Sequence, residues 1–382
     1  MSIYLDYNAS APVDLRVVDE MFRVYRNYIG NADSRTHDYG ERAGKIVDDA
    51  RGKVAFLLGV NKDEVFFTSG ATESNNIAIQ GLEEYGLNNG KKHIVTTAIE
   101  HKAVLETVKV MEKKGFDIDI VSPDESGRIN VAQLLSKVRS DTLLVSVMHV
   151  NNESGIIQPV FEIGNALAER NILFHIDATQ SCGKLVDEIR KLKYDMLSFS
   201  AHKLQGPQGI GVLVLKKKRY KLPPVKPIMY GGQQERGIRP GTIPVALVAG
   251  LGRACEIAEF EYQAYTEKTS KIKNEILDLL ESSGLKYTIN GNQNFCISST
   301  LNFSIEGVSS EALMLSTKQY CGISNGSACT SQIYSPSYVL AAMGLSQNQI
   351  ESSIRVSWGG ETDLEELKVE FKKFLDVAKA MC

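Results

Sequence analysis

Ser198-Phe-Ser-Ala-His-Lys203 runs directly into Leu-Gln-Gly206-Pro-Gln-Gly209-Ile-Gly211, and this stretch indicates both a fold and a chemistry. Apolar residues at 196, 197 and 199 predict a strand that ends near Lys203, with two serines and a histidine beside its amine. A lysine amine attacks an aldehyde well only when burial and nearby charges lower its pKa. Lys203 is therefore a candidate imine-forming residue, with a solvated strand-end lysine as the alternative.

Strand-length and helix-length segments alternate on both sides of this stretch. Strands are predicted at 64–68, 93–97, 117–121, 143–147, 173–176, 196–199 and 210–215, and helices at 14–28, 36–58, 72–87, 102–114 and 161–170. This alternation predicts an α/β fold with a mostly parallel central sheet covered by helices. A long helix over 244–283 precedes two more strands, at 298–304 and 354–358. We therefore expect a large α/β domain over 14–250 and a smaller α+β domain built from 1–13 and 251–382.

The composition of the 382 residues is that of an ordinary globular protein, with 43% hydrophobic and 23% charged residues. A formal net charge of -3 gives no electrostatic attraction to nucleic acid, so no direct nucleic-acid binding is expected. The sequence has neither a long apolar run nor a leader-like start, which favours a cytoplasmic protein without a membrane segment. Its six cysteines form no Cys-x-x-Cys pair, which argues against a zinc site and a disulfide framework.

Three more candidate groups follow predicted strands, where an open parallel sheet binds its ligands. The turn Ser69-Gly-Ala-Thr-Glu-Ser-Asn75 opens a helix whose free N–H groups could bind a phosphate, or could be an ordinary capped start. Asp177 follows an apolar strand, where a carboxylate is costly to bury unless it meets a cation; alone, it could equally be a structural aspartate that caps a turn. His101 follows another strand, and alone it would be structural. Together with Lys203 these groups supply an anion site, a ring-stacking partner, a counter-ion and an imine former, the four parts that hold pyridoxal 5'-phosphate (PLP).

Seven segments, in this order, carry a resemblance to a known family. They are Tyr4-Leu-Asp-Tyr-Asn-Ala-Ser-Ala-Pro12, Thr68-Ser-Gly-Ala-Thr-Glu-Ser-Asn75, Glu100-His-Lys-Ala-Val104, Met148-His-Val-Asn-Asn-Glu153, His175-Ile-Asp-Ala-Thr-Gln180, Ser198-Phe-Ser-Ala-His-Lys203 and Arg236-Gly-Ile-Arg-Pro-Gly-Thr242. Over essentially its full length the chain resembles the cysteine desulfurases of the NifS/IscS type, within the class-V aminotransferase family. The resemblance implies a fold type I PLP-dependent transferase that works as a homodimer.

The resemblance also implies the roles of individual residues. Lys203 would form the imine with the cofactor, Asp177 would pair with its ring nitrogen and Gln180 would reach its ring hydroxyl. The phosphate would be held by Ala71, Thr72, Ser200 and His202, and by Thr242 of the partner subunit. His101 would stack on the ring and help to move protons. Asn152 and Arg355 would hold the substrate carboxylate, for which the forked guanidinium of arginine is well shaped.

The segment Ser324-Asn-Gly-Ser-Ala-Cys329-Thr-Ser331 determines the expected reaction. From the residues alone Cys329 could be an incidental loop cysteine, whereas in the family the matching thiol accepts sulfur. The implied reaction converts L-cysteine to L-alanine: Lys203 removes the Cα proton, and the Cys329 thiolate attacks the substrate sulfur and becomes a persulfide. An acceptor protein would then take this sulfur for iron-sulfur cluster assembly, tRNA thiolation or DNA phosphorothioation. The alternatives are another class-V enzyme, such as a selenocysteine lyase or an aminotransferase, and a non-catalytic dimeric scaffold.

Overall fold

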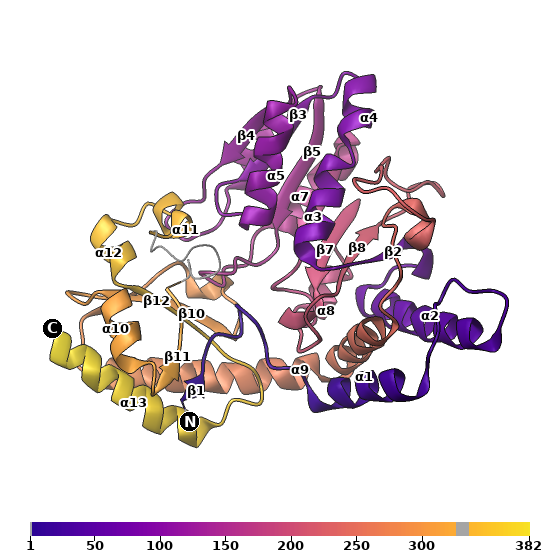
Figure 1. Cartoon of the computed structure of the whole chain (residues 1–382). Helices are drawn as coiled ribbons and strands as arrows, with labels where there is room; N and C mark the ends of the chain where they lie inside the picture. The colour runs from indigo at the N-terminus through magenta and orange to yellow at the C-terminus, as the bar shows by residue number, and fades with distance from the viewer. Residues whose placement is uncertain (1, 326–335) are drawn as a thin grey trace.

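The computed structural model describes residues 2–325 and 336–382 (Figure 1). Its strands are β1 (Ile3–Tyr4), β2 (Val65–Thr68), β3 (His93–Thr97), β4 (Asp117–Val121), β5 (Thr142–Met148), β6 (Leu173–Asp177), β7 (Met196–Ser200), β8 (Gly211–Leu215), β9 (Tyr287–Ile289), β10 (Thr300–Ile305), β11 (Cys321–Gly322) and β12 (Ser353–Ser357). Its α-helices are α1 (Leu15–Asn27), α2 (Asp38–Leu58), α3 (Ala71–Gln80), α4 (Glu83–Asn88), α5 (Lys102–Lys113), α6 (Val131–Lys137), α7 (Val160–Arg170), α8 (Val186–Ile189), α9 (Val245–Ser282), α10 (Ser310–Thr317), α11 (Tyr338–Ala342), α12 (Gln347–Glu351) and α13 (Leu364–Met381). No helix within these ranges is both long and apolar enough to cross a membrane.

A seven-stranded sheet with the order β2-β8-β7-β6-β5-β3-β4 forms the centre of the molecule. The neighbours from β7 to β4 pair in parallel, and β8 alone runs against both of its neighbours. The mostly parallel central sheet predicted from the sequence is therefore confirmed. Because β2 and β7 both run opposite to β8, the carboxyl ends of β2, β3, β5, β6 and β7 lie along one edge of this sheet.

Successive residues of the central strands enter two different apolar clusters, as the twofold repeat of a strand requires. Val65 and Phe67 pack with residues of α2, α7 and the first half of α9, whereas Phe66 packs with residues of α3 and α5 on the other face. The strands are therefore buried on both faces, which is why they appear in the sequence as nearly continuous apolar runs.

A second core lies in the C-terminal third of the chain. The antiparallel sheet β12-β10-β9 packs with α13 and with the second half of α9, and Ile3 and Leu5 join this core from the N-terminal segment. Helix α9 therefore belongs to both cores, and it lies along the base of the molecule in Figure 1. The division at residue 250, with 1–13 and 251–382 as a smaller domain, stays a prediction.

The helix predicted over 72–87 is wrong in its extent, because the chain forms α3 and α4 with a break at Gly81. The backbone N–H of Lys226 donates to Gly81 O at 2.8 Å and takes this carbonyl out of the helical ladder. A Cβ at Gly81 would lie 2.6 Å from Lys226 O, so the close approach of the two segments requires glycine. Gly81 and Lys226 are far apart in the sequence, so no local pattern predicts this contact.

Candidate active site

The structure brings the predicted strand-end residues to one edge of the central sheet. The phosphate turn (residues 68–72) follows β2, His101 follows β3, Asn152 follows β5, Asp177 ends β6 and Lys203 follows β7. All five strands point toward this edge, where open α/β sheets bind their ligands.

Lys203 ends a short 3-10 turn (Ala201–Lys203) that directly follows β7. Its Nζ donates to Asn8 O at 2.5 Å and to Ala9 O at 2.7 Å. Asn8 O also accepts from Gln180 Nε2 at 3.0 Å. The Lys203 amine and the Gln180 amide therefore donate to the same carbonyl, that of Asn8. A bound group can replace these main-chain acceptors.

Asp177 is buried, and its two carboxylate oxygens accept from neutral donors. Asn75 Nδ2 donates to Oδ2 at 2.8 Å, and the backbone N–H of Thr179 donates to Oδ1 at 3.0 Å. Within the described ranges no cation pairs with this carboxylate, although a buried acid ordinarily needs one. A protonated ring nitrogen such as that of PLP fits this environment.

The turn after β2 forms an anion-binding cradle at the start of α3. The N–H of Ala71 donates to Ser200 Oγ at 2.7 Å, and Gly70, which precedes the helix, has no side chain to cap it. A Cβ at Gly211 would lie 2.5 Å from Gly70 Cα, so glycine at 211 allows β8 to approach the turn. Ala71, Ser200 and the exposed Thr72 fit a phosphate, which helix N-termini bind through free N–H groups.

Two histidines at this edge are held in the neutral form. Burial lowers the pKa of His101, with the charge of Lys203 acting in the same direction and that of Asp177 against it. His101 Nδ1 accepts from the backbone N–H of Ala103 at 3.1 Å, which leaves Nε2 to carry the proton. Burial and the charge of Lys203 lower the pKa of His202 to about 4. The neutral His101 therefore presents an N–H donor at Nε2.

Arg355 and Asn152 meet next to a half-buried aspartate, Asp6. Arg355 Nη1 donates to Asn152 O at 2.9 Å, and Nη2 donates to Asp6 Oδ1 at 2.5 Å. Arg355 Nε and Asn152 Oδ1 are buried without a hydrogen-bond partner in the described part of the chain. Burial raises the pKa of Asp6 against the opposing charge of Arg355. A guanidinium with an unused donor beside an unused amide oxygen suits a ligand that carries a carboxylate and an amine.

One predicted residue, Thr242, lies apart from this cluster. It is exposed, on the segment that precedes α9. Cys329 falls outside the described residues. The roles of all the site residues stay predictions, although the described ones, apart from Thr242, lie at positions that suit one shared site.

Four residues of the site were missed by sequence reasoning. Asn75 binds Asp177, Asn8 supplies a main-chain acceptor to Lys203, Asp6 pairs with Arg355, and Glu100 lies next to His101. All four stand inside the quoted motifs, so only the chemistry of the Asp6, Asn75 and Glu100 side chains could have suggested a role. The carbonyl of Asn8 carries no sequence signal.

Glu100 is completely buried between β3 and β5. Its Oε1 accepts from Thr97 Oγ1 at 2.6 Å and from the backbone N–H of Met148 at 2.9 Å, while Oε2 has no partner in the described part of the chain. Burial, together with the negative charge of Asp177, raises the pKa of Glu100 to about 8. Glu100 is therefore a neutral acid at pH 7.

Replacing Glu100 with glutamine should make the protein less sensitive to alkaline pH. The folded pKa lies above the unfolded one, so the stability that this group contributes is complete below the unfolded pKa and is lost as pH rises toward about 8. Glutamine does not titrate. Between pH 5 and pH 8 the unfolding free energy of Glu100→Gln should therefore rise by on the order of 3 kcal/mol relative to that of the wild type. Urea unfolding at both pH values checks this, with the exposed Glu106→Gln as control. Equal pH slopes in wild type and Glu100→Gln would contradict the assignment.

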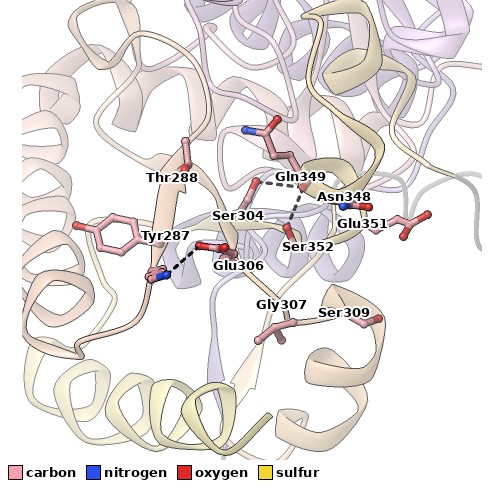
Figure 2. A pocket seen from close by; sticks show the side chains of 12 residues that line it. Tyr287, Thr288, Ser304, Glu306, Gly307, Ser309, Asn348, Gln349, Glu351 and Ser352 are labelled. Atoms are coloured by element: carbon pink, nitrogen blue, oxygen red, sulfur yellow. Dashed lines mark hydrogen bonds and ion pairs between the residues drawn. The ribbon is translucent and has the colours of Figure 1, made fainter. Parts of the chain in front are cut away.

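The structure has one cavity beside this edge and another away from it. A cavity of about 540 Å³ lies beside Lys203, between the N-terminal segment and α9, and Tyr7, Lys184 and Tyr265 are among its lining residues. Figure 2 shows another, of about 500 Å³, between β9, β10 and α12, lined by polar side chains such as Ser304, Glu306 and Gln349. The second cavity contains none of the predicted site residues. No cluster of three or more potential metal ligands occurs in residues 2–325 and 336–382.

The chain matches known proteins over nearly its whole length. The family model for class-V aminotransferases matches residues 3–369. The cysteine desulfurase IscS of Vibrio vulnificus (strain YJ016) is 42% identical over 370 residues, which cover 96% of this chain and 90% of that protein. A solved NifS-like protein is 36% identical, covers 100% of both chains and has a TM-score of 0.90. The structure of SspA in complex with cysteine is 35% identical, covers 95% of this chain and 100% of that chain, and has a TM-score of 0.82.

These similarities confirm the family, the enzyme class and the cofactor that the sequence motifs predict. The chain belongs to the class-V aminotransferase family and, within it, to the NifS- and IscS-like cysteine desulfurases, which depend on pyridoxal phosphate.

Proposed function

We propose that this chain removes sulfur from L-cysteine, releases L-alanine and carries the sulfur as a persulfide on Cys329. The observation that carries the proposal is the meeting of Lys203, Asp177 and the phosphate turn at one sheet edge, with an unused guanidinium donor on Arg355 nearby. The family membership and the cysteine bound in the SspA structure support this choice of substrate.

The residues at this edge divide the work of holding PLP. Ala71, Thr72, Ser200 and His202, with Thr242 of the partner subunit, would hold the phosphate, and Asp177 would pair with the ring nitrogen. When bound, the cofactor supplies an electron sink for the electron pair left at the substrate Cα. Lys203 binds the cofactor and removes the Cα proton, because its amine is partly buried and held among polar groups.

The substrate is oriented through its carboxylate. Arg355 Nε and Asn152 Oδ1 are free to bind the carboxylate and the amine of the amino acid, while Asp6 holds the guanidinium in place. Fixing the Cα–H bond toward Lys203 by contacts away from the reacting atoms is how an enzyme raises the rate of proton removal.

The sulfur-transfer step uses a second nucleophile. The Cys329 thiolate attacks the substrate sulfur, so that a bond between the two sulfurs forms as the carbon–sulfur bond breaks. The Cβ carbon keeps the electron pair and takes up a proton, Lys203 returns a proton to Cα, which gives alanine, and Cys329 is left as a persulfide. His101 carries its proton on Nε2, so it is suited to donate a proton during the formation of alanine.

Sulfur-labelled L-cysteine tests this proposal directly. In the wild type we expect label bound to Cys329 and alanine in solution, whereas Cys329→Ala should lose at least about a hundredfold in alanine formation because the nucleophile is gone. Cys382→Ala, which removes an exposed cysteine, is the matched control and should behave as the wild type. Unchanged alanine formation and sulfide release by Cys329→Ala would rule out the proposed reaction.

We further propose a homodimer and an acceptor protein for the sulfur. A row of exposed apolar side chains on α1 and just beyond it supports self-association, including Leu15, Phe22 and Ile29, which are 77%, 62% and 76% exposed. The acceptor would serve iron-sulfur cluster assembly, tRNA thiolation or DNA phosphorothioation, and adding candidate acceptors to the labelled enzyme distinguishes these pathways.

A further inference from the structure

One of the two edges of the central sheet is covered by charged side chains. Strand β2 forms this edge, and within the described residues it pairs only with β8. On its other side the N–H of Phe67 donates to Glu235 Oε2 at 2.8 Å, and Val65 O accepts from Arg51 Nη1 at 2.6 Å and from Arg236 Nη2 at 3.2 Å. Side chains thus satisfy backbone groups that an edge strand ordinarily leaves to water or to another chain.

A buried ion pair lies at the centre of this cover. Both oxygens of Glu235 accept from Arg51, at 2.6 and 2.9 Å, and the Glu235 side chain is 2% exposed. The Arg51 guanidinium also lies 4.5 Å from the centre of the Phe67 ring. A bidentate pair between guanidinium and carboxylate fixes both the position and the orientation of the Glu235 side chain, whereas a single hydrogen bond leaves it free to rotate.

The backbone held by this pair is strained. Glu235 and Arg236 are consecutive residues with φ values of 48° and 57°, in the left-handed region that non-glycine residues rarely occupy. Such conformations persist only where the surroundings impose them, and they cluster at functional sites. Here the Glu235 carboxylate and the Arg236 guanidinium, which lies 3.9 Å from the centre of the Phe66 ring, impose them.

The strained segment is also bonded to the phosphate turn. Strand β2 ends at Thr68 and leads directly into Ser69 and Gly70, so the contacts of Glu235 with this strand fix the approach to the turn. Farther along the same segment, Arg239 Nε donates to Glu73 Oε1 at 2.9 Å, and Glu73 Oε2 accepts from the N–H of Ser69 at 2.5 Å. Residues 235–239 therefore contact the chain both before and after the phosphate turn. Thr242, which follows them, is exposed to solvent.

We propose that Glu235 is a positioning residue for the cofactor phosphate, an inference that rests on the proposed function. Its carboxylate holds residues 235–242 in a shape that orders the phosphate turn of its own chain and presents Thr242 to the phosphate site of a second copy. Without the carboxylate, Arg51 loses its charged, two-point partner, and the contact that holds the left-handed residues is broken. The segment then relaxes, and both phosphate sites of the dimer lose donors.

The test measures PLP binding rather than turnover. Apoprotein is titrated with PLP and followed by the imine absorbance, and dimer dissociation is measured by analytical ultracentrifugation. For Glu235→Gln we expect PLP to bind at least about tenfold more weakly than to the wild type, with faster dimer dissociation. The control is Glu261→Gln, which removes a half-exposed carboxylate paired with Arg16 and should leave both values unchanged.

A double variant separates positioning from the effect of an unpaired buried charge. Arg51→Gln/Glu235→Gln leaves no unpaired charge, so its thermal stability should recover toward that of the wild type while PLP binding stays weak. It therefore also decides the question if Glu235→Gln alone folds poorly. Wild-type PLP affinity in the folded double variant would overturn the proposal. A wild type that binds no PLP would instead overturn the proposed function.

Discussion

Replacing Lys203 with alanine should abolish the imine absorbance at about 420 nm and lower alanine formation by about 10⁴-fold. Lys203 is the lysine that leaves the sheet edge between the phosphate turn and Asp177, and its Nζ lies against the carbonyls of Asn8 and Ala9. Alanine removes both the group that binds the cofactor and the base that takes the Cα proton. The absorbance of purified protein with added PLP and the release of alanine from L-cysteine measure the two losses separately.

The neighbouring Lys184 is the matched control for this prediction. It lines the same cavity, donates to Gln180 Oε1 at 3.4 Å, and has its pKa lowered to about 7 by burial and by the charge of Lys203. By its pKa alone Lys184 could be mistaken for the reactive amine. We expect Lys184→Ala to keep the absorbance and most of the activity. Loss of the absorbance in Lys184→Ala, with retention in Lys203→Ala, would reverse the assignment.

Replacing Arg355 with glutamine should reduce both substrate binding and stability. The guanidinium is almost completely buried and pairs with Asp6, so the variant leaves a carboxylate in a mostly buried site without its cation. Breaking a buried pair in this way costs about 3–5 kcal/mol in unfolding free energy. We also expect the KM for L-cysteine to rise by about a hundredfold, because a charge-assisted bond to the carboxylate is lost.

Urea unfolding and steady-state kinetics measure these two effects, and Arg16→Gln is the control. Arg16 pairs with Asp14 and Glu261 on the surface, with its side chain 44% exposed, so its loss should change the unfolding free energy by no more than about 1 kcal/mol. Equal stability losses in the two variants, or an unchanged KM in Arg355→Gln, would contradict the assignment of Arg355.

Much of the fold and the outline of the site could be predicted from the sequence, because both depend on local patterns. Apolar runs between helix-length segments predict the central strands, and Asp177 and Lys203 are recognisable because each follows such a run directly. The short strands β1, β9 and β11 could not be predicted, because two or three residues carry no periodicity. The break at Gly81 and the role of the Asn8 carbonyl depend on contacts between distant segments.

Helix α9 restricts how the two cores can move relative to each other. Its 38 residues span about 57 Å, with one half packed on the central sheet and the other on the C-terminal sheet. Because α9 is continuous and packed at both ends, rotation of one core relative to the other must bend the helix and distort its backbone hydrogen bonds. Small tilts are therefore favoured over wide opening, and a substrate on its way to Lys203 has to travel through openings that already exist.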